Sequence, residues 1–179
     1  SLRYALTHRS GTTVHLGGLG IPMVFNNIMN GRDLEQAYAK CSFYDPYIGE
    51  DAGYVQVARL TGLGPVLLAV PEGHTPFEAW KPILDHRSRD GKGLLLNDPT
   101  PRGATFEGSY DWMVHSAGFT ETDWKGVQEW NPGTESVMPP GATIYYCLRF
   151  FVAPSLRQIE PMLAARHRPI AVGIPGYIL

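Results

Sequence analysis

The chain has 179 residues, of which 44% are hydrophobic and 18% are charged, and its formal net charge is −2. This length and apolar content suffice for one globular domain. A near-neutral chain without basic clusters lacks the charged face that nucleic acids and anionic lipids require, so we expect neither nucleic acid nor membrane as a partner. No apolar run reaches the roughly 18 residues that a membrane span needs, and residues 1–25 lack the features of a signal peptide.

The chain contains 20 glycines and 15 prolines, and 11% of its residues are aromatic. This mixture is typical of many short strands joined by turns, so we expect a mainly β protein. In chain order, the pattern first predicts strands at Leu2–His8 and Thr12–Leu16, with a glycine-rich turn at Gly17–Gly20. Arg32–Lys40 has the composition of a short helix, and Ser42–Asp51 is predicted to be a turn-rich loop.

The middle of the chain contains two apolar runs, Tyr54–Leu60 and Pro65–Val70, which flank a short loop with two glycines. This arrangement predicts a β-hairpin whose second strand ends at Pro71. The segment Asp85–Gly103 is predicted to be a mainly polar loop.

The next predicted strand, Thr105–Ser116, alternates between apolar and polar residues. Trp112 belongs to the apolar face, so we expect it in the core. The opposite face carries Glu107, Asp111 and His115, each four residues from the next, which is about 13 Å along a strand. Paired catalytic carboxylates lie about 5–9.5 Å apart, so these residues do not form a catalytic pair with one another.

Three interpretations of this polar face remain open. It is a solvated strand face, a surface that contacts a ligand, or part of a catalytic site. The last interpretation needs a partner folded back from the following segment, where the available carboxylates are Glu121, Asp123 and Glu129.

Towards the C-terminal end, Thr143–Val152 is apolar on both faces, which predicts a central strand covered on both sides. Ser155 is a candidate cap for a helix over residues 156–167, and Pro161 fits that helix only in its first turn. A last short strand is predicted at Ile170–Ile174.

The run Tyr110–Asn131 holds three of the four tryptophans, together with a histidine and several carboxylates. Aromatic rings beside such polar groups are suited to binding sugars, although rings equally fill cores. Trp124 and Trp130 lie in irregular sequence, where they either stack on a ligand or pack under a neighbouring domain. The candidate ligand-binding residues are Asp111, His115, Glu121, Trp124 and Trp130.

The sequence offers no pattern for a metal or a cofactor. His8 and His15 are too far apart for a local metal pair, and neither a phosphate-binding loop nor a dinucleotide fingerprint is present. We therefore expect no metal and no cofactor. Cys41 and Cys147 either form one disulfide that closes a long loop or remain two buried thiols.

Several stretches together resemble one protein family. They are DPYIGEDAGYVQVARL at residues 45–60, GPVLLAVPEGHTPFEAW at 64–80, YDWMVHSAGFTETDWK at 110–125, EWNPGT at 129–134 and RPIAVGIPGYIL at 168–179. The chain resembles the amino-terminal β-sandwich domain of large, uncharacterised fungal and bacterial proteins described as glycoside-hydrolase-like.

This resemblance implies an antiparallel two-sheet β-sandwich of the mutarotase-like supersandwich type, with a short helix near the C-terminus. It also implies a larger helical domain that follows the sandwich and holds the main cleft, a carbohydrate partner and a secreted or extracellular location. It assigns no catalytic residue to this chain.

The leading hypothesis takes residues 1–179 as a single domain, a fragment of a longer chain. This domain would support or complete the substrate cleft of the following helical domain without being catalytic alone. The alternatives are a free-standing carbohydrate-binding module and a small glycan-cleaving enzyme that uses Asp111, His115 or Glu121 as acid and base. Hydrolysis and elimination remain equally open.

Overall fold

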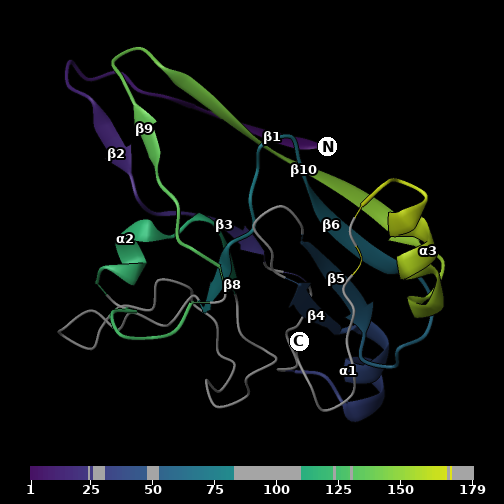
Figure 1. Ribbon diagram of the computed structural model, residues 1–179. Helices are drawn as coiled ribbons and strands as arrows, with labels where there is room; N and C mark the ends of the chain where they lie inside the picture. Colours follow the sequence, from purple (N-terminus) through teal and green to yellow (C-terminus); the bar gives the residue numbers. More distant parts are fainter. Residues whose placement is uncertain are drawn as a thin grey trace.

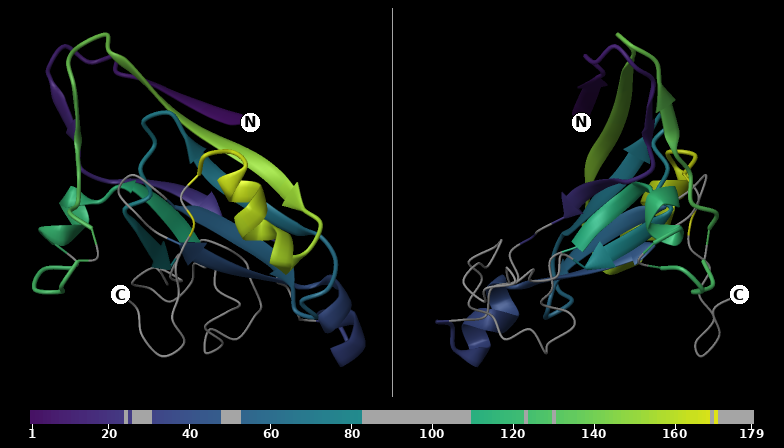
Figure 2. Two further views of the ribbon diagram at one scale, coloured as in Figure 1. Left: turned by 45° about the vertical axis from the view of Figure 1, so that its right-hand side comes forward. Right: turned by 90° about the vertical axis from the view of Figure 1, so that its left-hand side faces the viewer.

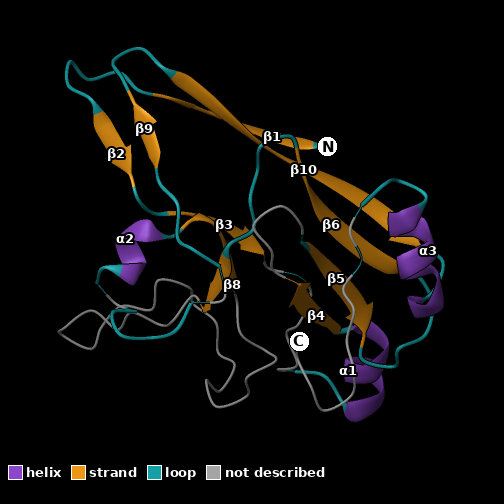
Figure 3. Ribbon diagram, viewed as in Figure 1, coloured by secondary structure: helices purple, strands orange, loops and turns teal. Residues whose placement is uncertain are grey.

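The computed structural model describes residues 1–23, 25, 31–47, 53–82, 110–122, 124–129, 131–168 and 170. Its regular structure is mainly antiparallel strands, arranged in two sheets and a ribbon (Figure 1, Figure 3). The larger, five-stranded sheet has the order β1 (Leu2–Thr7), β10 (Thr143–Ala153), β6 (Val66–Glu72), β5 (Tyr54–Arg59) and β4 (Ser42–Tyr47).

The smaller sheet has the order β3 (Leu19–Met23), β8 (Tyr110–His115) and β7 (Ala79–Pro82), and β2 (Val14–Leu16) pairs with β9 (Ser136–Met138) in a separate ribbon. The helices are α1 (Leu34–Lys40), α2 (Ala117–Thr120) and α3 (Ile159–Ala164), and the last follows a 3-10 turn at Leu156–Gln158. Among the described residues, no helix is long and apolar enough to cross a membrane.

The core lies between the two sheets. Trp112 of β8 is 1% exposed and packs on Phe77, with 4.1 Å between the ring centroids. Side chains of β3 and β8 there meet those of β5, β6 and β10 in one buried cluster. The opposite face of the larger sheet is covered by α3, which buries Ile159 and Leu163 against β6 (Figure 2). This confirms the predicted sandwich, the position of Trp112 in the core and the short C-terminal helix.

The two sheets are joined by two antiparallel chain segments, which stay paired as they turn from one sheet to the other. β1, β2 and β3 pair in turn with β10, β9 and β8, so two chain paths lie side by side from the larger sheet, through the ribbon, into the smaller sheet (Figure 1). The chain crosses between the sheets a second time over residues 73–78, which link β6 to β7. The candidate site lies between these two crossings.

The predicted hairpin is confirmed as β5 and β6, but β6 continues through Pro71 to Glu72. Pro71 pairs with Leu148 of β10, and the pairing of β6 with β5 extends only from Leu67 to Ala69. The missing N–H of Pro71 therefore interrupts no ladder on the β5 side.

The prediction of a loop at Ser42–Asp51 is wrong over residues 42–47, which form β4. Among the described strands, β4 lies at the edge of the sheet and pairs only with β5, with Pro46 opposite Val55. An edge strand tolerates a proline, since the N–H on its outer side has no partner to lose. The turn-forming residues of this segment therefore did not exclude a strand.

β10 is central, between β1 and β6, as predicted, but it is not covered along its whole length. Tyr145, Phe150 and Val152 are 49%, 38% and 62% exposed, and β6 is instead the strand buried on both faces. In the described structure, the core cluster shared with the smaller sheet includes Tyr146 and Leu148 of β10, with Ile144 packed against it, and does not include Phe150 or Val152. The apolar residues on both faces of β10 therefore predicted more burial than the structure shows.

The two helices that the sequence predicts, α1 and α3, both form at the expected places. The Asp33 side chain caps α1 by accepting the Gln36 N–H at 2.8 Å. Pro161 lies in the first turn of α3, where its missing N–H costs no helical hydrogen bond. Ser155 precedes the 3-10 turn, but its side chain makes no capping hydrogen bond, so that predicted role is wrong.

The predicted loop at 85–103, the first part of the strand predicted at 105–116 and residues 171–174 lie outside the described residues. Residue 170 is described and is not in a strand. Cys41 and Cys147 do not form a disulfide, so that alternative is wrong.

Candidate functional site

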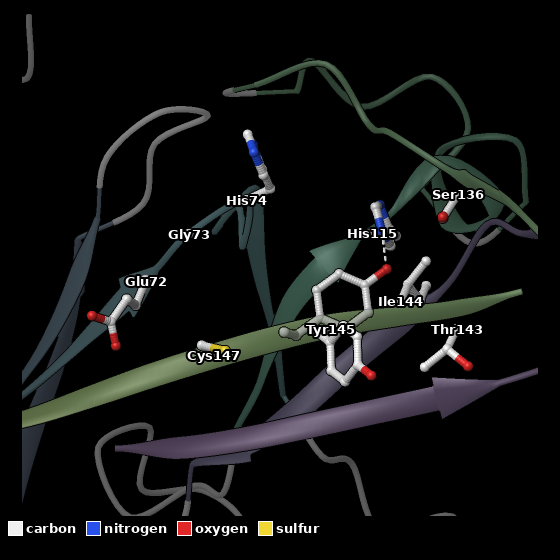
Figure 4. Close-up of a pocket in the computed structure, with 10 residues that line it drawn as sticks. Glu72, Gly73, His74, His115, Ser136, Thr143, Ile144, Tyr145 and Cys147 are labelled. Carbon is white, nitrogen blue, oxygen red and sulfur yellow. Dashed lines mark hydrogen bonds between the residues drawn. The ribbon is translucent and has the colours of Figure 1, made fainter.

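A cavity of about 490 Å³ opens at the corner between the larger sheet, the ribbon and the 73–78 crossing (Figure 4). One wall is the start of β10, and the others come from the residues after β6, the end of β8 and the start of β9. The lining residues are Glu72, Gly73, His74, His115, Ser136, Thr143, Ile144, Tyr145, Tyr146 and Cys147.

The wall formed by β10 is a strand edge. β6 pairs with β10 only from Cys147 onward. At Cys147 the backbone N–H of β10 is bound by a side chain. The Cys147 N–H donates to Thr75 Oγ1 at 2.8 Å, and this hydroxyl donates to the Glu72 carbonyl at 2.9 Å. Alternation along the strand then points the backbone N–H and C=O of Tyr145 to the same side, towards the cavity. The cavity therefore has directional polar groups from the backbone as well as from side chains.

His115 and Tyr146 form a hydrogen-bonded pair at this cavity. His115 Nε2 lies 2.6 Å from the Tyr146 hydroxyl (dashed line in Figure 4), and His115 Nδ1 lies 2.8 Å from Thr134 Oγ1. Ser136 lines the same cavity. His115 and Tyr146 are 7% and 4% exposed, so most of each ring lies in the protein and a small part faces the cavity.

A buried carboxylate lies behind this pair. Glu78 is 1% exposed, and the Ser116 hydroxyl donates to its Oε2 at 2.6 Å. The Thr134 N–H lies 3.1 and 3.0 Å from the two carboxylate oxygens, and the Thr134 hydroxyl donates to Oε1. Asn131 secures the same segment by donating to the Glu78 carbonyl at 2.9 Å. In the described part of the chain, Glu78 is thus held by hydrogen-bond donors and by no basic side chain.

Burial sets the protonation of the pair. It lowers the pKa of His115 from its ordinary value of 6.5, and the charge of Glu78 opposes this effect. Burial raises the pKa of Tyr146 from 10.0; the nearby Ser136 hydroxyl opposes this shift and the Glu78 charge adds to it. At neutral pH we therefore expect an uncharged imidazole beside a protonated phenol.

Among the predicted ligand-binding residues, His115 lines the cavity. It is buried, as is its neighbour Met113, so this part of β8 is not a solvated strand face. Asp111 is half-buried on the same strand, opposite Pro22 in the pairing with β3. Glu121 is exposed at the end of α2.

The predicted tryptophans lie elsewhere or outside the described structure. Trp124 is half-buried against Phe119, with 5.4 Å between the ring centroids and 34° between the ring planes. Trp130 is not among the described residues. The structure therefore does not join these tryptophans to the cavity, and their ligand-binding role stays a prediction.

Sequence reasoning did not select Glu78, Thr134, Ser136 or Tyr146. Glu78 and Thr134 are 56 positions apart, and His115 and Tyr146 are 31 positions apart, so no local spacing joins them. One signal was present: Glu78 follows Phe77 and precedes Ala79 and Trp80, an apolar setting in which a carboxylate needs a partner.

The donor chemistry of the cavity does not suggest a metal. The described residues contain no group of three or more His, Cys, Asp or Glu side chains arranged to hold a metal ion. The imidazole nitrogens of His115 are both within hydrogen-bonding distance of hydroxyl oxygens. This arrangement suits proton transfer or hydrogen bonding.

Among solved structures, the chain is similar in fold to a protein named Polysaccharide Lyase BACCELL_00875, with a TM-score of 0.60 and 14% sequence identity. The match covers 92% of this chain and 19% of that protein, so the chain spans about a fifth of its length. At this identity the similarity shows a shared β-sandwich fold.

No curated protein matches the chain. A family model does match, over residues 1–179, and it describes a family of unknown function. The chain therefore belongs to the family DUF5695.

Proposed function

We propose that this chain is the β-sandwich domain of a carbohydrate-active enzyme and that the cavity beside β10 contacts a sugar unit of the substrate. The observation that carries the proposal is the His115–Tyr146 pair, whose hydroxyl and imidazole meet at the wall of an open cavity of about 490 Å³. A cavity of this volume accommodates a ligand of one to a few sugar rings.

The remaining cavity wall suits a polyhydroxylated ligand. Ser136 and Thr143 contribute hydroxyls, and the strand edge contributes the backbone groups of Tyr145. The Tyr145 ring is 49% exposed, with the Arg3 guanidinium 3.9 Å from its centroid. Sugar rings bind through such a combination of directional hydrogen bonds and aromatic faces.

We further propose that this cavity forms one part of a longer substrate cleft. The fold neighbour is a much longer protein named as a polysaccharide lyase, of which this chain covers 19%. By analogy, the parent of this chain would carry an adjacent helical domain and act on a polysaccharide outside the cell. Asp111, Glu121, Trp124 and Trp130 would then contact the substrate beyond the cavity, or the adjacent domain.

One observation favours a free-standing carbohydrate-binding module as the second candidate. Phe119 of α2 and Trp124, in the segment that follows this helix, form a half-buried aromatic pair. Such a pair can act as a stacking platform without help from another domain. Binding that depends on Trp124 and not on Tyr146 would support this candidate.

The test is a binding titration of the chain with a panel of oligosaccharides, followed by calorimetry and by amide chemical shifts. Tyr146→Phe removes the hydroxyl and keeps the ring, so we expect it to weaken binding about tenfold. Tyr38→Phe, at an exposed position on α1, is the matched control and should bind like the wild type. Binding that is equal for both variants, or shifts confined to residues far from the cavity, would refute the proposed site.

A further inference from the structure

The polar groups behind the cavity form a single hydrogen-bonded row of four residues: Glu78, Thr134, His115 and Tyr146. The direction of each hydrogen bond follows from chemistry. A carboxylate accepts, so the one hydroxyl hydrogen of Thr134 points to Glu78. The Thr134 oxygen must then accept from His115 Nδ1, which carries the hydrogen.

The other end of the row follows in the same way. A neutral imidazole has one N–H, so when Nδ1 carries the hydrogen, Nε2 is an acceptor. The Tyr146 hydroxyl, 2.6 Å from Nε2, therefore donates its hydrogen to His115. The phenol oxygen then has lone pairs that can accept a hydrogen bond from a ligand.

We propose that Glu78 is a positioning residue for the cavity: acting through Thr134, it holds His115 as the Nδ1–H tautomer and turns the Tyr146 hydroxyl into a hydrogen-bond acceptor towards the ligand. The ligand group at this point must then be a donor, such as a sugar hydroxyl. A carboxylate or sulfate ester, which only accepts, is disfavoured.

The charges around the cavity agree with this assignment. The lining residues include Glu72 and, in the described structure, no lysine or arginine; the nearby Arg3 guanidinium is engaged with the Tyr145 ring, 3.9 Å from its centroid. Glu72 forms an ion pair with Arg149, so the positive charge of Arg149 is balanced within the protein. A neutral hydroxyl-bearing face of a sugar therefore fits this cavity better than a uronate carboxylate. This specificity rests on the proposed function, whereas the tautomer of His115 does not.

The first experiment measures the tautomer of His115 in the ligand-free chain by long-range nitrogen–proton correlation. We expect the Nδ1–H form in the wild type. Thr134→Val removes the hydroxyl at nearly constant volume and should shift His115 towards the Nε2–H form, as should Glu78→Gln. Ser116→Ala removes a donor to Glu78 that lies outside the row and should leave the tautomer unchanged. An Nε2–H wild type, or a Thr134→Val variant that keeps Nδ1–H, overturns the positioning role.

The second experiment measures binding of cello-oligosaccharides and of their C6-oxidised, uronic counterparts of equal length. We expect the wild type to bind the neutral series about tenfold more tightly, and Thr134→Val to lose much of this preference. Equal or reversed preference in the wild type overturns the specificity. Absence of binding by both series contradicts the proposed function, while the tautomer measurement still decides the role of Glu78.

Discussion

His115 gives the site a dependence on pH at the level of one residue. Burial lowers its pKa in the folded chain below 6.5, so the unfolded chain binds a proton more readily. Stability should therefore rise with pH across the window between the lowered pKa and 6.5, and should fall as the pH decreases through that window. The stabilising contribution of the neutral His115 is fully present at pH values above the pKa of His115 in the unfolded chain.

The first prediction follows from this linkage. Between about pH 7.5 and about pH 5.5, the free energy of unfolding should fall more steeply for the wild type than for His115→Gln. Urea unfolding at both pH values measures the difference. The other histidines are common to both proteins and cancel in the comparison. Parallel pH profiles for the two proteins would contradict the assigned burial effect.

The second prediction separates two tryptophans. Trp112 is 1% exposed and packs on Phe77, so Trp112→Ala should cost about 3–5 kcal/mol of unfolding free energy. Trp124 is half-buried against Phe119, and Trp124→Ala should cost about 1 kcal/mol. Chemical denaturation measures both. A loss at Trp124 as large as that at Trp112 would make Trp124 a core residue and remove it as a ligand-binding candidate.

At the residue scale, the sequence could predict those side chains whose environment depends on a local period. The alternation along β8 placed Trp112 in the core and selected His115 as a candidate. It could not predict Glu78 or Tyr146, because their partners come from distant strands and the crossing between the sheets. Tyr146 in particular belongs to a mostly apolar strand in the sequence, and only the turn of the paired segments brings it to His115.

At the scale of elements, the segment before β9 lies very close to α2. A Cβ added to Gly133 would be 2.9 Å from the Ala117 nitrogen and 3.0 Å from its Cα, both backbone atoms. The Ala117 N–H also donates to the Thr134 carbonyl at 3.2 Å. This close approach helps to hold Thr134 against Glu78, so the position of α2 and the geometry of the site are coupled.

The third prediction tests this coupling. Gly133→Ala should destabilise the chain by about 1–3 kcal/mol, because backbone must move to admit the methyl group. It should also shift the NMR resonances of His115, since Thr134 is displaced. Gly11→Ala is the matched control, with no atom within 4 Å of its added Cβ, and should be nearly neutral in both measurements. An effect of Gly133→Ala no larger than the control would refute the close packing.

Elements with strong local signals were predictable. The glycine-containing loop identified the β5–β6 hairpin, and the helix-forming composition of Arg32–Lys40 identified α1. β4 was not predictable in this way, because an edge strand needs only one partner and accepts Pro46. The exposure of Phe150 and Val152 also depended on how far the smaller sheet extends, which no local pattern encodes.

At the scale of the whole molecule, the cavity is a product of topology. It lies where β6 ends, where the start of β10 has an edge that no described strand pairs with, and where the paired strands turn from the larger sheet towards the smaller one. Each of these features depends on strand order, which long-range pairing decides. The sequence resemblance implied the sandwich, whereas the site depends on long-range strand pairing that only the structure shows.

The last prediction concerns what the chain does by itself. We expect residues 1–179 to bind oligosaccharides without cleaving them. Among the described residues that line the cavity, Glu72 is the only carboxylate, and it is paired with Arg149. Glu78 is buried behind the cavity and its oxygens already accept several hydrogen bonds. The described cavity therefore lacks the two facing carboxylates of glycoside hydrolysis.

Cleavage is measured by the appearance of reducing ends, for hydrolysis or elimination, and of ultraviolet-absorbing unsaturated products, for elimination alone. A longer protein that includes the proposed helical domain serves as the positive comparison. Turnover by the chain itself, abolished by Asp111→Asn or Glu121→Gln with the fold intact, would contradict this prediction and favour a complete small enzyme. Binding without turnover is expected because the acid–base groups at the cavity, His115 and Tyr146, are hydrogen-bonded to each other and largely buried. In the proposed function, the adjacent domain supplies the groups that act on the bond.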